Sequence, residues 1–109
     1  MMASQGQIEL LYFDGCPNHH LARQLLQEVL REEGLQAPII DVPVETPEAA
    51  VKQRFLGSPT IRINGDDIEP AADDEQYSLR CRVYRVNGKI SGAPEKEMIR
   101  AALQKFMKK

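Results

Sequence analysis

The residues best suited to chemistry stand in one short stretch, Cys16-Pro17-Asn18-His19-His20, at the head of a predicted helix. Thiolate is the nucleophilic form of cysteine, and the unpaired N–H groups and dipole at a helix start favour an anion. A histidine three or four positions along lies within one helical turn and could carry a proton to or from the sulfur. The pattern therefore predicts a reactive thiol at Cys16, with His19 or His20 as its proton partner.

The same side chains also have purely structural interpretations. A free cysteine often behaves as a small buried hydrophobic residue, and histidines are frequent on the surface at helix starts. Two neighbouring histidines on a helix cannot both face one site, and we favour His19 because it takes the last place of a C-x-x-C spacing that begins at Cys16. From these residues alone, a reactive Cys16 and an inert one remain equally open.

Composition indicates an ordinary globular chain of one domain. Its 109 residues are 42% hydrophobic and 28% charged, with a net charge of −2, which is enough for a single packed core. No basic stripe is evident, which argues against a nucleic-acid or membrane partner. Residues 1–7 lack the regions of a signal peptide, and no apolar run reaches the ~18 residues that span a bilayer. We therefore expect a cytoplasmic protein with a flexible start (1–7) and one domain (8–109).

In the first half, hydrophobic spacing predicts the elements that would position Cys16. Residues 8–13 are mostly apolar and predict a buried strand, and helical spacing then continues to a stop at Gly34. Residues 38–44 predict a second strand, at a sheet edge because Pro43 cannot donate to a neighbour. Thr46 is the predicted cap of a short second helix.

In the second half, residues 60–63 alternate as a strand does and end in an Asn64-Gly65 turn. After an acidic loop, the alternation resumes over residues 79–86, with Leu79, Cys81 and Val83 on one predicted face and most of the arginines, with Tyr84, on the other. A last helix is predicted from Pro94. The order strand, helix, strand, helix, strand, strand, helix predicts an α/β fold: a mixed four-stranded sheet with helices on both faces.

The sequence Ser58-Pro59-Thr60 opens the third predicted strand, and Cys16 stands at the first strand-to-helix junction. With the order of elements over residues 8–105, these features resemble the thioredoxin superfamily. More narrowly, the segments LLYFDGCP, FLGSPTIRINGDDIEP, LRCRVYR and SGAPEKEMIRAAL are similar to a small bacterial thioredoxin-like family. Its members have a D-G-C-P start, and some are proposed selenoproteins.

The resemblance implies a thioredoxin-like fold and roles for particular residues. Cys16 matches the nucleophilic cysteine, and Pro59 matches a proline that is cis in the superfamily and faces the thiol. Ser58, Pro59 and Thr60 would contact the substrate, Ser58 through its backbone. The chain departs from the pattern at His19, which stands where the resolving cysteine would be. Dithiol exchange within one C-x-x-C motif is therefore excluded.

Cys81 is the candidate for the missing partner of Cys16. A disulfide between them requires Cα atoms within ~7 Å, which the sequence does not establish. The structural interpretation is that Cys81 faces the core, because Leu79 and Val83 share its side of the predicted strand. Both interpretations remain open.

Three functions follow from these observations. The first, which we expect, is a thiol–disulfide oxidoreductase or redox protein in which Cys16 attacks, and Cys81 or an external thiol resolves the mixed disulfide. Its partner would be a thiol- or disulfide-bearing protein or small molecule, and we expect a monomer without cofactor or metal. The second is a soft-metal site made by both cysteines and a histidine. The third is an adaptor that keeps the fold without the chemistry, so the sequence does not decide whether the protein is an enzyme.

Overall fold

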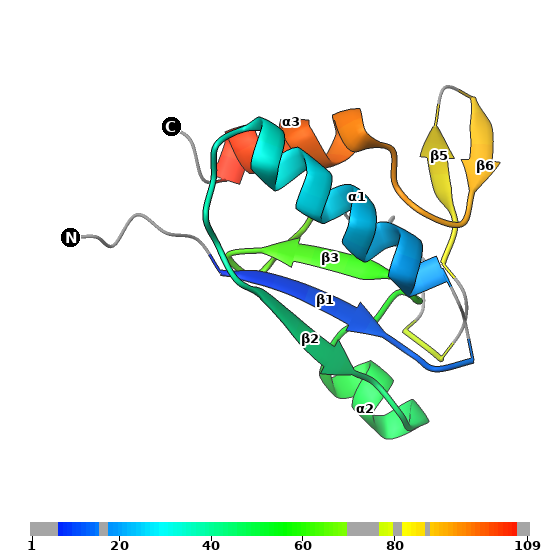
Figure 1. Cartoon of the computed structure of the whole chain (residues 1–109). Coiled ribbons are helices and arrows are strands. Elements are labelled where there is room, and N and C mark those ends of the chain that lie inside the picture. Colours follow the sequence, from blue (N-terminus) through cyan, green and yellow to red (C-terminus); the bar gives the residue numbers. More distant parts are fainter. Residues whose placement is uncertain (1–6, 16–17, 70–76, 80–81, 87, 107–109) are drawn as a thin grey trace.

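The structure, a computed structural model, describes residues 7–15, 18–69, 77–79, 82–86 and 88–106. Two predicted residues of the site, Cys16 and Cys81, lie outside this part of the chain. The elements follow one another as β1 (Ile8–Tyr12), α1 (Asn18–Glu32), β2 (Ile39–Pro43), α2 (Pro47–Lys52), β3 (Thr60–Ile63), β4 (Asp66–Asp67), β5 (Tyr84–Val86), β6 (Lys89–Ser91) and α3 (Lys96–Phe106) (Figure 1). The last helix begins two residues after the predicted Pro94.

The main sheet has the strand order β2-β1-β3-β4. β1 is parallel to β2 and antiparallel to β3, and β3 is antiparallel to β4. The mixed four-stranded sheet and the edge position of Pro43 are therefore confirmed. The turn between β3 and β4 is confirmed too: Asn64 and Gly65 have φ angles of 55° and 88°, the positive values that a two-residue hairpin turn requires.

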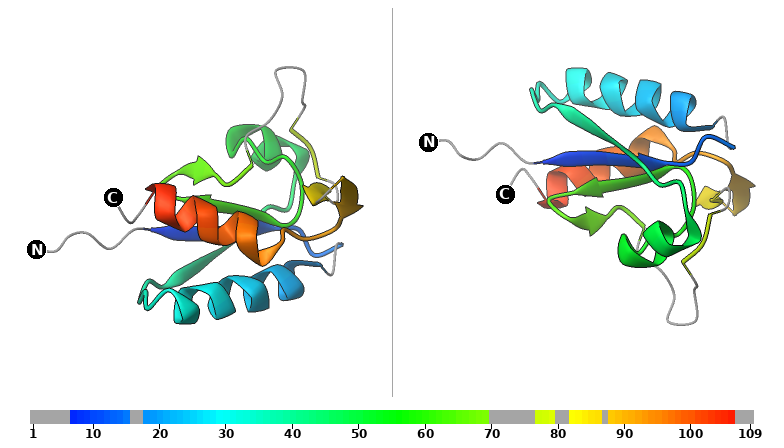
Figure 2. Two further views of the ribbon diagram at one scale, coloured as in Figure 1. Left: turned by 90° about the horizontal axis from the view of Figure 1, so that it is seen from above. Right: turned by 90° about the horizontal axis from the view of Figure 1, so that it is seen from below.

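Helices cover both faces of the sheet, as the sequence predicts. α1 and α3 lie side by side on one face and α2 lies on the other (Figures 1 and 2). The larger core cluster packs Leu10 and Ile61 of the sheet against Leu26 of α1 and Leu103 of α3. The smaller cluster, on the α2 side, consists of Leu11, Val44, Ala50 and Phe55. Leu21 of α1, by contrast, is 47% exposed.

Both predicted helix boundaries of the first half have the expected local chemistry. At the end of α1, Gly34 has φ +69°. The N–H groups of Gly34 and Leu35 donate to the carbonyls of Arg31 (3.2 Å) and Leu30 (2.9 Å), which is a Schellman motif. At the start of α2, the hydroxyl of Thr46 accepts from the N–H of Ala49 at 3.0 Å.

The fourth strand of the sheet is not the one that the sequence predicts. β4 takes the edge beside β3, whereas β5 pairs with β6 in a separate two-stranded hairpin. Arg82 and Tyr84 alternate with Val83 as the sequence predicts, but the buried side is the one with the arginine and the tyrosine. Arg82 and Tyr84 are 6% and 0% exposed, while Val83 is 57% exposed. The reason lies in the polar partners of Arg82 and Tyr84, described below.

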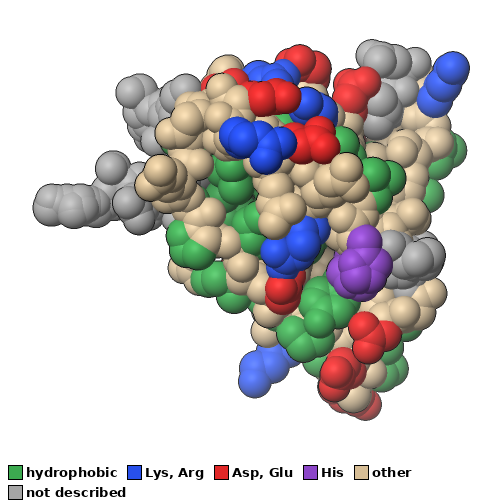
Figure 3. Space-filling model, in the orientation of Figure 1, with side chains coloured by type: hydrophobic (Ala, Val, Ile, Leu, Met, Phe, Trp, Pro, Cys, Tyr) green, Lys and Arg blue, Asp and Glu red, His purple; other side chains and the backbone are tan. Residues whose placement is uncertain are grey.

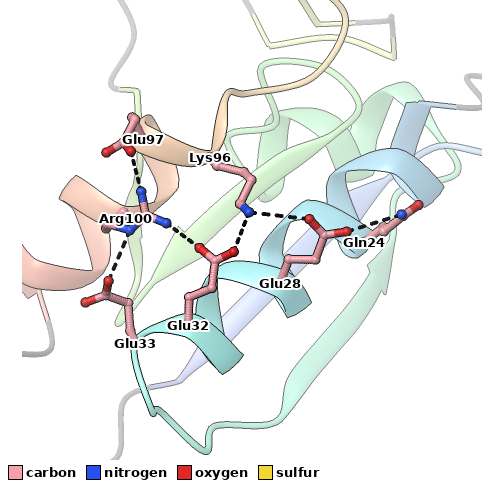
Figure 4. Close-up of polar contacts among 7 residues, drawn as sticks. All are labelled: Gln24, Glu28, Glu32, Glu33, Lys96, Glu97 and Arg100. Atoms are coloured by element: carbon pink, nitrogen blue, oxygen red, sulfur yellow. Dashed lines mark hydrogen bonds and ion pairs between the residues drawn. The ribbon is translucent and has the colours of Figure 1, made fainter.

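Acidic residues of α1 and basic residues of α3 bind the two helices together at the surface (Figure 4). Lys96 lies 3.6 Å from Glu28 and also pairs with Glu32. Arg100 pairs with Glu32, with Glu97 and, at 3.0 Å, with Glu33. Among the described residues, no helix has the length and apolar character that crossing a membrane requires.

Candidate functional site

The described neighbours of Cys16 place it between the end of the central strand β1 and the start of α1. Phe13 follows β1 and packs partly buried against the smaller core cluster, and α1 begins at Asn18. Gly15 makes this connection compact, because a Cβ there would lie 2.5 Å from the ring of Phe13. The described chain resumes at Asn18 with a helix of 15 residues, and the setting of Cys16 itself stays a prediction.

The two histidines form a stack with Tyr12 of β1. The ring centroids of Tyr12 and His19 are 4.4 Å apart with nearly parallel planes, and those of His19 and His20 are 4.0 Å apart. His20 is exposed and His19 half-buried, and histidine side chains are visible at the surface in Figure 3. The two neighbouring rings are therefore in contact, which leaves the expectation that only one of them faces the site a prediction. Both belong to one stack, in which His19 is the inner ring.

The Ser58-Pro59-Thr60 segment lies beside the end of β1, because Leu11 pairs with Thr60 in the antiparallel register. The Ser58–Pro59 peptide bond is cis, the isomer that the resemblance implies. All three residues are buried; Ser58 and Thr60 have no exposed surface. A substrate would reach their backbone only after displacing the protein segment that covers it.

That covering segment is residues 82–84, which donate hydrogen bonds to the carbonyl groups of Ser58 and Pro59. The N–H of Arg82 donates to the carbonyl of Ser58 at 2.8 Å. The hydroxyl of Tyr84 donates to the carbonyl of Pro59 at 2.6 Å, and that of Thr60 donates to the carbonyl of Gly57 at 2.6 Å. Three successive carbonyls are thus satisfied inside the protein, as buried polar groups must be.

The guanidinium of Arg82 is the centre of a buried polar cluster, hereafter the Arg82 cluster: Thr60, Asp67, Glu69, Arg82 and Tyr84. Nη1 of Arg82 donates to Thr60 Oγ1 at 3.1 Å and to Asp67 at 2.8 Å, and Nη2 donates to the carbonyl of Glu69. The guanidinium carbon lies 4.7 Å from the ring centroid of Tyr84, a cation–π distance.

The protonation states of this cluster follow from burial and charge. Burial by itself would lower the pKa of Arg82, but the acidic groups around it, and the hydrogen bond that Arg82 donates to Asp67, raise the pKa above its usual value. Burial raises the pKa of Tyr84, against the opposing effect of Arg82. The arginine therefore stays charged, and the tyrosine keeps the proton that it donates to Pro59.

Gly57 permits the close contact between these segments. Its φ is +130°, and a Cβ on it would lie 2.9 Å from Cβ and 3.0 Å from Cα of Arg82. The obstacle includes backbone atoms, so no rotamer change of Arg82 would remove it. Only glycine fits here.

A third segment reaches the same end of the molecule. The segment that follows the β5–β6 hairpin approaches the start of α1. Directly after β6, a Cβ on Gly92 would lie 2.3 Å from the side-chain nitrogen of Asn18. The start of α1, the Ser58–Pro59 segment and the end of the hairpin therefore surround the end of β1.

The Arg82 cluster was not predicted as part of the site. Alternation placed its arginine and tyrosine on a solvent face, because charged side chains usually lie outside. Its partners, Asp67 and the carbonyl of Pro59, are 15 and 25 positions away in the sequence. A weak signal was present: an acidic pair follows the Asn64-Gly65 turn, where a hairpin strand was due.

Metal chemistry finds no support in the described part of the chain, where no three His, Cys, Asp or Glu side chains converge. Cys16 and Cys81 lie outside this part, so the soft-metal hypothesis remains untested. A hollow of about 500 Å³ lies elsewhere, between α1 and the start of β2. It is lined by residues near the end of α1, whereas Cys16 precedes the start of that helix.

Comparison with protein families gives a match over most of the chain. The model described as "Domain of unknown function (DUF2703)" matches residues 19–103, from the first turn of α1 to the last turns of α3. No curated protein matches the chain.

Proposed function

The chain belongs to the DUF2703 family, a name that describes no activity, and we propose from the arrangement of its residues that it is a thioredoxin-like thiol–disulfide redox protein. Cys16 is the nucleophile in this proposal. Cys81 or an external thiol resolves the mixed disulfide, and the substrate is a disulfide-bearing protein or small molecule.

One observation supports the proposal most directly: the hydrogen bond from the N–H of Arg82 to the carbonyl of Ser58. Arg82 follows Cys81 in the sequence, and consecutive Cα atoms are ~3.8 Å apart. Ser58 lies near the end of β1, beyond which Cys16 follows after a short turn. Neighbours of the two cysteines, far apart in the sequence, are therefore close in the fold.

A second contact agrees with this. Phe13, three positions before Cys16, and Leu79, two positions before Cys81, pack against the same small core cluster. The strand-to-helix connection that carries the first cysteine and the segment that carries the second thus share one hydrophobic support.

The chemistry balances with the residues and partners named. The Cys16 thiolate attacks one sulfur of the substrate disulfide, the S–S bond breaks, and the leaving thiolate takes up a proton. The Cys81 thiolate then attacks the Cys16 sulfur of the mixed disulfide. The substrate leaves as a second thiol, with both electrons, and the protein is left with a 16–81 disulfide. An external dithiol of the thioredoxin type reduces that disulfide and is itself oxidised.

His19 is the proposed proton partner of Cys16. It lies in the first turn of α1, and stacking against Tyr12 limits the directions its ring can take. His20 is exposed and serves as a matched control, because it is the same side chain one position along.

The proposal is tested by the pH dependence of alkylation of Cys16, measured by mass spectrometry in the wild type and in Cys16→Ser and Cys81→Ser variants. We expect half-maximal reactivity below the ordinary cysteine pKa of about 8.5, shifted by His19→Gln and not by His20→Gln. We expect diamide, a small oxidant, to produce an intramolecular 16–81 disulfide in the wild type.

An ordinary alkylation profile, together with no 16–81 or mixed disulfide after oxidation, would overturn the redox proposal and favour the adaptor. Treating Cys81→Ser with a disulfide substrate, in the absence of any external thiol, shows whether Cys81 or an external thiol resolves the mixed disulfide. If Cys81 resolves, the mixed disulfide at Cys16 accumulates in this variant; if an external thiol resolves, it accumulates equally in the wild type.

A further inference from the structure

The outer surface of α1 carries two parallel rows of side chains, each spaced by four residues. Gln24, Glu28 and Glu32 form the first row, which faces α3 (Figure 4). Its two carboxylates pair with Lys96, and Glu32 also pairs with Arg100 of α3. The first row is therefore neutralised within the protein.

The second row lies one position before the first along α1 and borders β2 instead of α3. It consists of Arg23, Gln27 and Arg31. Arg23 pairs with Asp41 of β2. No described residue forms a hydrogen bond or an ion pair with the side chain of Gln27 or of Arg31. The two rows thus have the same spacing on one helix, but only in the first does every side chain have a described partner within the protein.

The second row forms one rim of the hollow of about 500 Å³ between α1 and the start of β2. Leu30, Leu35 and Ile39 supply its apolar wall, and all three also contact or belong to the larger core cluster. Figure 3 shows this side of the molecule, where basic side chains lie beside apolar ones. A volume of this size is within the ~300–1,000 Å³ of small-molecule sites.

The charge of the lining has one sign. The ionisable residues of the lining are both arginines, Arg23 and Arg31, and no carboxylate belongs to it. A cation in the last turn of a helix has a structural use, since it favours the helix dipole. That use would explain Arg31 alone. It does not explain why an uncharged Gln27 and an apolar hollow accompany it.

We propose that this hollow binds a small organic anion with an apolar chain, specifically a medium-chain aliphatic carboxylate. The carboxylate would accept the two parallel N–H bonds that a guanidinium offers, from Arg31, with Gln27 as a neighbouring donor. The alkyl chain would lie along Leu30, Leu35 and Ile39, where it removes apolar surface from water.

The site is separate from the proposed thiol chemistry. Cys16 precedes the first residue of α1, and the hollow is lined chiefly from Leu30 onward. The lining begins at Arg23, but Arg31, the proposed anion ligand, lies 13 residues after the start of α1 at Asn18, which corresponds to about 20 Å along the helix axis. The inference stands or falls independently of the redox function.

The test is a titration of the full-length, ¹⁵N-labelled protein with octanoate, followed by NMR, with octan-1-ol as the uncharged probe of equal chain length. We expect octanoate to shift the amide signals of residues 23–39 and to bind more tightly than octan-1-ol. Arg31→Gln should weaken octanoate binding at least fivefold and leave octan-1-ol binding unchanged.

Arg85→Gln is the matched control, because Arg85 is an exposed arginine on the separate hairpin; it should bind octanoate as the wild type does. Gln27→Glu is a second variant at the rim, and it should weaken octanoate binding by repulsion. The proposal is overturned if signals of residues 23–39 do not shift, if octanoate and octan-1-ol bind equally, or if Arg85→Gln weakens binding as much as Arg31→Gln.

Discussion

Arg82 and Arg31 carry the same side chain in opposite environments, one buried and one exposed. Arg82 is 6% exposed, and its guanidinium donates to Thr60, Asp67 and the carbonyl of Glu69. Arg31 is exposed beside an apolar hollow, and its guanidinium bonds to no described residue. A buried cation must find its partners within the chain, so the contacts of Arg82 show what it supports. A guanidinium without a described partner at the rim of a hollow is available to an anionic ligand.

The largest expected effect on stability is that of replacing Arg82. Arg82→Met should lower the free energy of unfolding by about 3–5 kcal/mol, because it leaves the largely buried Asp67 carboxylate without its cation. Urea denaturation at pH 7 measures this loss. The exposed neighbour on β5 is the control: Arg85→Met should stay within about 0.5 kcal/mol of the wild type. A stable Arg82→Met protein would contradict the importance given to the cluster.

The next effect concerns the hydroxyl of Tyr84. Tyr84→Phe leaves the buried carbonyl of Pro59 without its donor and should cost about 1–3 kcal/mol, again measured by urea denaturation. Because burial raises the pKa of Tyr84, the folded state holds this proton when the unfolded chain loses it. Its contribution is present below the unfolded pKa of about 10 and decreases as the pH rises above it. The variant should therefore lose less stability in alkali than the wild type.

The sequence predicted the first half of the chain well because its signals are local. The apolar run of β1, the stop at Gly34, the cap at Thr46 and the edge proline Pro43 each depend on near neighbours. The predictions for the second half of the chain were wrong where the burial of a residue depended on partners far away in the sequence. No local pattern distinguishes a solvated arginine from one that meets an aspartate in another hairpin.

The candidate site shows the same division. The segment beside β1 that contains Ser58 and Pro59 was identified by resemblance, but its burial under residues 82–84 was not. The burial of this segment depends on the two carbonyl bonds donated by Arg82 and Tyr84. The roles of Cys16 and Cys81 remain predictions.

A smaller effect is expected at the α1–α3 surface. The hydrogen bond and charge of Lys96 lower the pKa of Glu32, and Arg100 contributes to the same shift. A carboxyl group with a lowered pKa in the folded state stabilises the fold at pH values above its unfolded pKa of about 4.3. This stabilisation is lost as the pH falls through the pKa of the folded state. Lys96→Gln should reduce the loss of stability between pH 6 and pH 3 in urea titrations. An unchanged acid dependence would show that these pairs contribute nothing measurable, as many surface pairs do.

The smallest effect is expected for Arg31→Gln. Since no described residue depends on this guanidinium, the unfolding free energy should change by less than about 1 kcal/mol, mainly through the helix dipole. Thermal and urea denaturation both measure it. A loss comparable to that of Arg82→Met would show that Arg31 has a structural function and would remove the contrast between the two arginines.

The contact of Gly57 with Arg82 has a practical consequence for genetics. An alanine at position 57 would act as a wedge between two stretches of backbone, since its methyl group would meet Cβ and Cα of Arg82. The paired residues of the main sheet begin at Thr60 on this strand, so the wedge would spare them. Gly57→Ala is therefore a means of loosening residues 82–84 from Ser58–Pro59 while both cysteines keep their natural sequence context.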